Sequence, residues 1–191
     1  MVKRIVTSNP DEASSFLKEA MAAGHEGLMA KALQSDYTPG VRGKKWFKIK
    51  PFDQLDLVIV AADWGYGRRT NWLSDYYLAA LDSVTGEFIE VGKTFKGLTD
   101  EEFEEMTQNL LKLKKSETEH TVYVKPEIVV EVAFNEIQKS PHYESGMALR
   151  FARITRVRND KGPKDASTIL EMRKRYKEQF RYKALREEGD L

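Results

Sequence analysis

Two lysines near position 50 have the residue type and the spacing that phosphate binding requires. Lys48 and Lys50 lie two residues apart in the strand-like run Trp46-Phe47-Lys48-Ile49-Lys50. Alternate side chains of a strand share one face, so the two ammonium groups are expected roughly 6 to 7 Å apart, close enough to hold one phosphate group. Phe47 and Ile49 are then expected to point into a core. The alternative is that both lysines lie on a solvated strand face.

A second set of cations lies near the C-terminal end of the sequence. A closing strand is expected over residues 149–158, with Arg150, Arg156 and Arg158 on one side and Arg153 on the other. The planar guanidinium group can contact two phosphate oxygens at once, whereas lysine acts as a point charge. The alternative is a general nucleic-acid-binding surface, which would need the charges but no fixed order.

A third cluster combines basic and aromatic residues. Tyr66, Arg68, Arg69 and Trp72 fall in a loop between two expected strands. Such loops contact nucleic acid through phosphates and base stacking, so Arg68 and Arg69 are candidates for backbone or minor-groove contacts. The alternative is an exposed hairpin tip.

Composition limits the kinds of site that the chain can hold. The sequence has 191 residues with no cysteine, which excludes disulfides and thiolate metal sites, and its three histidines are scattered. The formal net charge is +1, but residues 150–186 contain thirteen Lys or Arg against four Asp or Glu, a local charge of +9. This segregation indicates an anionic partner such as nucleic acid or polyphosphate, and a solvated basic helix is the alternative.

Local patterns predict the elements that must position these residues. Asn9 and Pro10 begin a helix that ends near Gly24, and a short apolar strand follows from Gly27 to Lys31. After Pro51, strands are expected over residues 55–62, 76–81, 88–91 and 121–134, the last region being interrupted by Lys125-Pro126, and the closing strand follows. A capping box from Thr99 to Glu102 predicts the start of a helix between the third and fourth of these strand regions. A charged helix is expected over residues 171–187.

These elements predict a mostly β protein with some helices. Short antiparallel strands with one intervening helix and a closing strand are typical of a Greek-key barrel of the OB type. The preceding helix, strand, loop and strand are typical of the end of an α/β unit. We therefore expect three parts, with boundaries at residues 1–52, 53–170 and 171–191.

Three stretches in this order resemble one protein family. They are the run from Glu26 to Lys31 (EGLMAK), the run from Trp46 to Lys50 (WFKIK), and residues 149–161 (LRFARITRVRNDK). They are similar to the fourth, fifth and sixth nucleotidyltransferase motifs of ATP-dependent DNA ligases, most closely those of the archaeal and eukaryotic replicative type. The resemblance covers residues 24–168 and implies that residues 1–52 are the C-terminal part of an adenylation domain preceding an OB-fold domain.

The resemblance assigns catalytic roles at the first site. It implies that Lys48 and Lys50 stabilise the charge on the α-phosphate of ATP, and later that of the AMP attached to a DNA 5′ phosphate. Glu26 is then the motif carboxylate near the nucleotide and a Mg²⁺ ion, which binds few carboxylates besides waters and phosphates. Arg42 matches a basic position before the fifth motif and is a weaker candidate for binding the nucleotide.

The resemblance also assigns roles to the later cations. Arg156, Arg158 and Lys161 would orient the β- and γ-phosphates as pyrophosphate leaves, with Asp160 orienting a neighbour. Ala152 stands where relatives often have proline, a departure that leaves the basic pattern intact. Arg68, Arg69, Arg150 and Arg153 are the candidates for binding DNA.

The implied activity is that of the C-terminal part of a DNA ligase. The complete enzyme would use ATP and Mg²⁺ to seal 3′-OH/5′-phosphate nicks through enzyme-AMP and DNA-AMP intermediates. No KxDGxR string occurs in the sequence, so the lysine that becomes adenylated is not among these residues. We therefore expect this chain to bind DNA without adenylating itself, whether it is a C-terminal piece or half of a split enzyme. Two alternatives remain open: a fragment of an RNA-capping guanylyltransferase, and a non-catalytic OB module that binds nucleic acid or protein.

The expected partner is nicked double-stranded DNA, with no membrane. A sliding clamp is not assigned, because relatives usually make that contact elsewhere in the enzyme. The expected location is with the nucleoid in the cytoplasm of an archaeon, or in the nucleus of a eukaryote.

Overall fold

The computed structural model describes residues 3–35 and 45–187, and the side chains of these residues up to Gln179. The chain divides into two compact units, with Phe52–Glu178 forming the larger one and Met1–Pro51 belonging to the smaller one. Among the described helices, none is long and apolar enough to cross a membrane.

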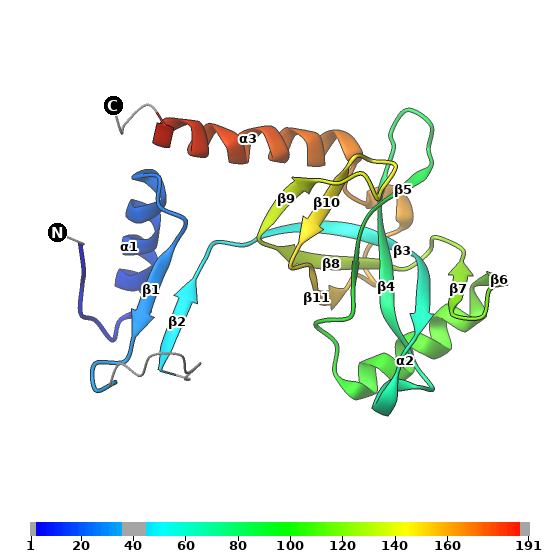
Figure 1. Cartoon of the computed structure of the whole chain (residues 1–191). Helices are drawn as coiled ribbons and strands as arrows, with labels where there is room; N and C mark the ends of the chain where they lie inside the picture. The colour runs from blue at the N-terminus through cyan, green and yellow to red at the C-terminus, as the bar shows by residue number, and fades with distance from the viewer. Residues whose placement is uncertain (1–2, 36–44, 188–191) are drawn as a thin grey trace. The chain divides into compact units, whose positions relative to one another are not determined.

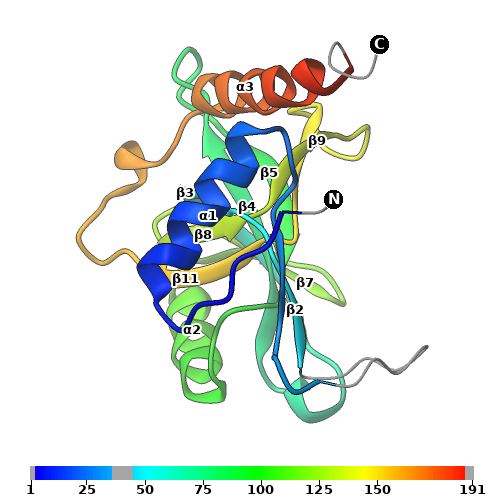
Figure 2. The same ribbon diagram turned by 90° about the vertical axis from the view of Figure 1, so that its left-hand side faces the viewer.

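The smaller unit contains a helix and a two-stranded hairpin. Helix α1 (Pro10–Ala22) begins where the Asn9 side chain accepts a hydrogen bond from the Asp11 backbone N–H. Strands β1 (Leu28–Lys31) and β2 (Trp46–Ile49) pair in antiparallel fashion. Figures 1 and 2 both show α1 alongside this hairpin.

The expected burial of Phe47 and Ile49 is wrong for this unit. The side chains are 58% and 38% exposed, and no described residue up to Pro51 is buried. A hairpin and one helix offer too little apolar surface to enclose a side chain on all sides.

The larger unit is built around a twisted antiparallel sheet. Its main path runs in the order β11-β8-β3-β4-β5, and β7 pairs with both β3 and β6. A separate hairpin joins β9 and β10. The strands are β3 (Asp53–Trp64), β4 (Leu73–Leu81), β5 (Phe88–Thr94), β6 (Lys114–Glu117), β7 (Thr121–Val124), β8 (Val129–Phe134), β9 (Glu136–Lys139), β10 (Met147–Arg150) and β11 (Arg153–Val157).

Hydrogen bonds link the two edges of this sheet. The Ile154 backbone N–H donates to the Lys96 carbonyl at 3.0 Å, and the Thr94 hydroxyl donates to the Ala152 carbonyl at 2.6 Å. These bonds join the segment after β5 to β11, so the sheet curls toward closure as in a small OB barrel. The expected fold class, mostly β with an OB-fold barrel, is confirmed.

The barrel has a substantial apolar core. Its largest fully buried side chains come from several strands and from both helices of the unit: Leu55, Leu57, Ile59, Leu73, Tyr76, Leu78, Phe103, Leu110, Ile137, Ile154 and Met172. Helix α2 (Asp100–Lys112) begins with the expected capping box between Thr99 and Glu102 and buries Phe103 against Tyr76. Two short 3-10 helices, Gly67–Arg69 and Pro163–Asp165, and helix α3 (Ile169–Glu187) complete the described elements.

The single closing strand expected over residues 149–158 is wrong. Phe151 has a φ of 57°, a left-handed conformation that interrupts the extended backbone between β10 and β11. Arg150 therefore ends β10, which pairs with β9, whereas Arg153 begins β11, which pairs with β8. A register shift between Ile154 and Arg156 further breaks the expected alternation.

Candidate functional site

The pairing of β1 with β2 gathers the charged residues of the smaller unit. Directly opposite residues of an antiparallel pair lie on one face, and Met29 is opposite Lys48 while Lys31 is opposite Trp46. Lys48 therefore shares its face with Trp46 and Lys31, as expected for alternate residues of one strand. The strand ends at Ile49, so Lys50 is the first residue after it.

Glu26 and Lys50 form an ion pair across this hairpin. The Lys50 Nζ lies 2.9 Å from the Glu26 Oε2, and the two side chains are 36% and 52% exposed. A contact of this exposure contributes little to stability, because water screens both charges. Its value is geometric, since it places a carboxylate beside Lys50, one of the two candidate phosphate-binding lysines.

Gly27 makes this close approach feasible. It has a φ of +147°, and a Cβ atom built at this position would lie 2.1 Å from the Ile49 carbonyl oxygen. A side chain here would clash with backbone, so only glycine lets the chain bring Glu26 beside Lys50 in this register.

Aromatic packing orients the neighbouring residues of the hairpin. The Lys31 ammonium lies 4.0 Å from the centre of the Trp46 ring, and the Trp46 indole N–H donates to the Ser35 hydroxyl at 2.8 Å. Lys31 is therefore held by a cation–π contact rather than presented as a third phosphate ligand. Arg42, the remaining candidate of this region, lies outside the described residues.

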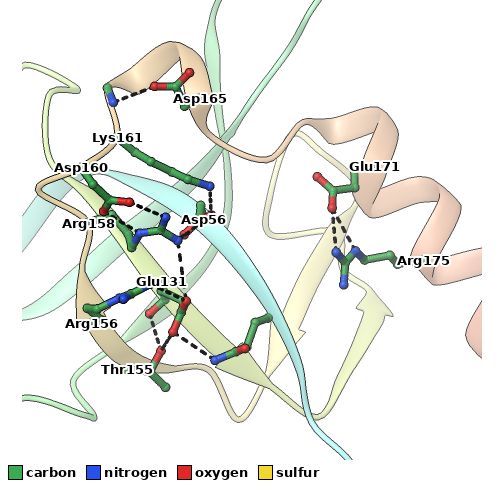
Figure 3. Close-up of polar contacts among 12 residues, drawn as sticks. Asp56, Glu131, Thr155, Arg156, Arg158, Asp160, Lys161, Asp165, Glu171 and Arg175 are labelled. Atoms are coloured by element: carbon green, nitrogen blue, oxygen red, sulfur yellow. Dashed lines mark hydrogen bonds and ion pairs between the residues drawn. The ribbon is translucent and has the colours of Figure 1, made fainter.

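A more buried charge network surrounds Arg158 in the barrel, as Figure 3 shows. The Arg158 Nε and Nη2 atoms donate to the two carboxylate oxygens of Asp160 at 2.8 and 2.7 Å. Its Nη1 donates to Asp56 at 3.0 and 3.2 Å. The Arg158 side chain is only 12% exposed, and Glu131 lies 3.7 Å from its Nη1.

Lys161 and Arg156 complete this network. The Lys161 Nζ donates to Asp56 at 2.6 Å, while the Arg156 Nη2 lies 3.4 Å from Glu131 and its side chain is 60% exposed. The three cations therefore do lie together, each against a carboxylate. The sequence did not identify Asp56 or Glu131, because their approach depends on how β3, β8 and β11 pair.

The network shifts the ionisation of its members. The hydrogen bonds from Arg158 hold the pKa of the Asp160 carboxyl well below its usual value. The hydrogen bonds to Asp160 likewise raise the pKa of Arg158, with Asp56 and Glu131 adding to the effect. The neighbour that Asp160 contacts is Arg158, and the orienting role of Asp160 stays a prediction.

The predicted DNA-binding residues have different surroundings. Arg68 is 73% exposed, with its nearest carboxylate, that of Asp100, at 3.8 Å. Arg69 turns inward, where its guanidinium lies 4.0 Å from the centre of the Phe103 ring and its Nη1 donates to the Phe95 carbonyl.

The other two predicted DNA-binding residues lie near the interruption between β10 and β11. Arg150 donates to Glu136 at 2.6 Å and lies 5.1 Å from the centre of the 62% exposed Phe151 ring. Arg153 is exposed at the start of β11.

The described residues also limit how a metal ion could bind. Within residues 3–35 and 45–187, no group of three or more His, Asp or Glu side chains could hold a metal ion. Mg²⁺ often binds through one or two carboxylates together with substrate phosphates and waters, and the half-exposed carboxylate of Glu26 fits that mode.

Two families match the sequence of this chain. Residues 1–50 match the family described as "ATP dependent DNA ligase domain", and residues 69–161 match "ATP dependent DNA ligase C terminal region". DNA ligase 1 of Korarchaeum cryptofilum is 59% identical over 181 residues, which are 95% of this chain and 34% of that protein. The DNA ligase of Thermococcus fumicolans is 48% identical over 187 residues, or 97% of this chain and 34% of that protein. The chain thus spans about a third of the length of these curated relatives.

Solved structures show a similar fold. The ligase domain of M. tuberculosis LigD aligns with a TM-score of 0.52 and 24% identity, over 80% of this chain and 50% of that one. A structure titled Pmar-Lig_Pre aligns with a TM-score of 0.59 and 23% identity, over 81% of this chain and 32% of that one.

Proposed function

Since this chain belongs to the family of ATP-dependent DNA ligases, we propose that it is the C-terminal part of an enzyme that seals nicks in double-stranded DNA. The observation that carries the proposal is the β1–β2 hairpin, which brings Glu26 to 2.9 Å from Lys50 with Lys48 two residues away. The family matches disfavour an RNA-capping enzyme and a non-catalytic module, which were the two alternatives.

The hairpin residues act on the α-phosphate in this proposal. Transfer of AMP places negative charge on the oxygens of the α-phosphate, and the ammonium groups of Lys48 and Lys50 stabilise that charge. Glu26 offers a carboxylate to a Mg²⁺ ion, which would neutralise phosphate charge when bound. Before substrate binds, the ion pair with Glu26 orients the ammonium group of Lys50. When phosphate oxygens approach, they compete with Glu26 for that ammonium group.

The barrel residues act on the rest of the triphosphate. Arg156, Arg158 and Lys161 supply three positive charges for the β- and γ-phosphates, which leave together as pyrophosphate. The exposed cations Arg68, Arg150 and Arg153 contact DNA phosphates, while Arg69 supports its loop by packing on Phe103. Such contacts make DNA binding by this chain sensitive to salt. The parent enzyme works where DNA is, in the nucleoid or the nucleus.

The decisive experiment uses the full-length parent and this chain side by side. With labelled ATP and Mg²⁺, we expect a covalent AMP adduct on the parent and none on this chain, because the chain contains no KxDGxR string. Lys50→Ala in the parent should abolish sealing of a nicked duplex, since one of the two ammonium groups is lost. Lys18→Ala, on the exposed side of α1, is the matched control and should seal normally.

Two results would contradict the proposal. An AMP adduct on this chain would show that the nucleophile lies among these residues. Near-normal sealing by the Lys50→Ala parent would remove the phosphate role from the hairpin.

A further inference from the structure

Asp56 is a carboxylate that touches two of the proposed phosphate-binding cations at once. It accepts hydrogen bonds from the Arg158 Nη1 at 3.0 and 3.2 Å and from the Lys161 Nζ at 2.6 Å (Figure 3). It lies on β3, about a hundred residues before them in the sequence, and outside the three motif stretches.

The backbone holds Asp56 firmly in place. It is paired in register with Glu131 on β8, and its carbonyl oxygen accepts a hydrogen bond from the Ser167 N–H at 2.7 Å. The Asp56 side chain is 15% exposed, whereas that of Asp160 is 65% exposed in the turn after β11. Asp56 is therefore the fixed carboxylate of the pair, and Asp160 is the one open to solvent.

The two carboxylates occupy different edges of the Arg158 guanidinium. Asp160 binds the Nε and Nη2 edge with two parallel hydrogen bonds, the arrangement that guanidinium groups also use for phosphate. Asp56 binds Nη1, on the other side of the group. If phosphate oxygens approach the Nε and Nη2 edge, the contact with Asp56 can persist and keep that edge pointing in the same direction.

We propose that Asp56 is a positioning residue, which fixes Arg158 and Lys161 so that both cations meet the leaving pyrophosphate in one orientation. The proposal rests on the function proposed above. It gives Asp56 no contact with substrate, because Asp56 acts through the two cations. In this role, Asp56 strengthens phosphate binding. Its negative charge alone would weaken phosphate binding, because removing a negative charge next to a phosphate site strengthens anion binding.

Loss of the Asp56 charge alone should strengthen phosphate binding, whereas loss of its positioning role should weaken it. The direction of the change can therefore be tested directly on this chain. Binding of inorganic tripolyphosphate is measured by titration calorimetry for the wild type, Asp56→Asn and Asp53→Asn. Asp53 is the matched control, because it also lies on β3 and accepts a hydrogen bond from an arginine, Arg175 of α3. We expect Asp56→Asn to bind about tenfold more weakly, the loss typical of removing a residue that orients a ligand-binding group. Asp53→Asn should bind as well as the wild type.

A second measurement separates positioning from simple loss of folding. In the full-length parent, Asp56→Asn should slow self-adenylation at limiting ATP about tenfold. It should still seal a nick that already carries AMP, because that reaction releases no pyrophosphate. Asp56→Glu, which retains the carboxylate, should recover part of the lost adenylation rate.

The outcomes are distinct. The positioning role would be overturned if Asp56→Asn bound tripolyphosphate as tightly as Asp53→Asn does, or more tightly. It would also be overturned if Asp56→Asn lost self-adenylation and sealing of the preadenylated nick to the same extent. If the wild-type parent forms no AMP adduct, the proposed function fails, and the tripolyphosphate titration still decides the role of Asp56.

Discussion

The hairpin and the barrel hold the cations proposed to bind phosphate in contrasting ways. Among the described residues, Lys50 forms an ion pair with Glu26, in a unit where no described residue up to Pro51 is buried. Arg158 lies against Asp56 and Asp160 on a barrel with an extensive core, and its side chain is 12% exposed. A single exposed carboxylate contacts the first cation, whereas a network of carboxylates surrounds the second.

This contrast predicts how activity and stability should separate. Removing a hairpin cation takes away phosphate contacts and little else, because an exposed ion pair contributes little to stability. Removing Arg158 takes one of its two cation partners from the largely buried carboxylate of Asp56, which costs stability as well as activity.

Among the residues of the barrel, Arg158→Ala is expected to have the greatest effect. In the parent it should reduce self-adenylation by about 10²- to 10³-fold, the usual loss when one charge-stabilising donor is removed. In this chain it should also lower the melting temperature of the barrel, because Asp56 and Asp160 lose their shared partner. Calorimetry and adenylation assays measure the two effects. Lys115→Ala, on the exposed strand β6, is the control and should change neither.

The distinction between hairpin and barrel would fail in either of two cases. Arg158→Ala could leave the melting temperature unchanged, or Lys50→Ala could lower it as much as Arg158→Ala does. The first result would mean that the carboxylate network gives the barrel no stability beyond that of its core. The second would mean that the exposed ion pair of the hairpin contributes as much to stability as the network does.

A smaller effect is expected from Gly27→Ala. The added Cβ would meet the Ile49 carbonyl oxygen at 2.1 Å, so the hairpin must shift and Glu26 moves away from Lys50. Sealing by the parent should fall about tenfold, because displacing a positioned group by a small distance is costly. The melting temperature of the barrel should stay the same.

The control for this substitution is Gly86→Ala. Gly86 also has a positive φ, +75°, but a Cβ at this position meets nothing within 4 Å. It should therefore carry the conformational cost of alanine without the clash, and sealing should be preserved. Equal losses of sealing in both variants would show that backbone conformation, rather than the approach of Glu26 to Lys50, explains the effect of Gly27→Ala.

Local signals in the sequence were sufficient for the hairpin and for most elements of the barrel. The capping box at Thr99 and the alternation of Trp46 and Lys48 depend on residues a few positions apart, so the sequence predicts them directly. The break at Phe151 was missed because a left-handed conformation is uncommon outside glycine, and nothing in its neighbours signals it. The roles assigned to the site residues stay predictions.

The partners of the barrel cations could not be predicted in the same way. Asp56 reaches Arg158 because β3 pairs with β8 and β8 with β11, and each pairing joins residues far apart in the sequence. No local pattern in the sequence distinguishes Asp56 from the other polar residues of the strands. Charge networks between strands of one sheet thus depend on the strand pairing and its register, which local sequence patterns do not reveal.

The smallest expected effect concerns pH and tests whether the Arg158 network depends on an ionised Asp160. Because Arg158 lowers the pKa of this carboxyl in the folded state, the ionised group stabilises the fold above the usual aspartate pKa of 3.8. That contribution is lost as the pH falls through the lower pKa of the folded state. Asp160→Asn should therefore lower the urea midpoint of this chain at pH 7, and the difference from the wild type should shrink as the pH is brought below 3.8. If the difference in urea midpoint between Asp160→Asn and the wild type stayed constant down to about pH 2, the contact would stabilise the barrel through packing or neutral hydrogen bonds. The barrel would then resemble the hairpin, because both would gain little stability from charge pairing.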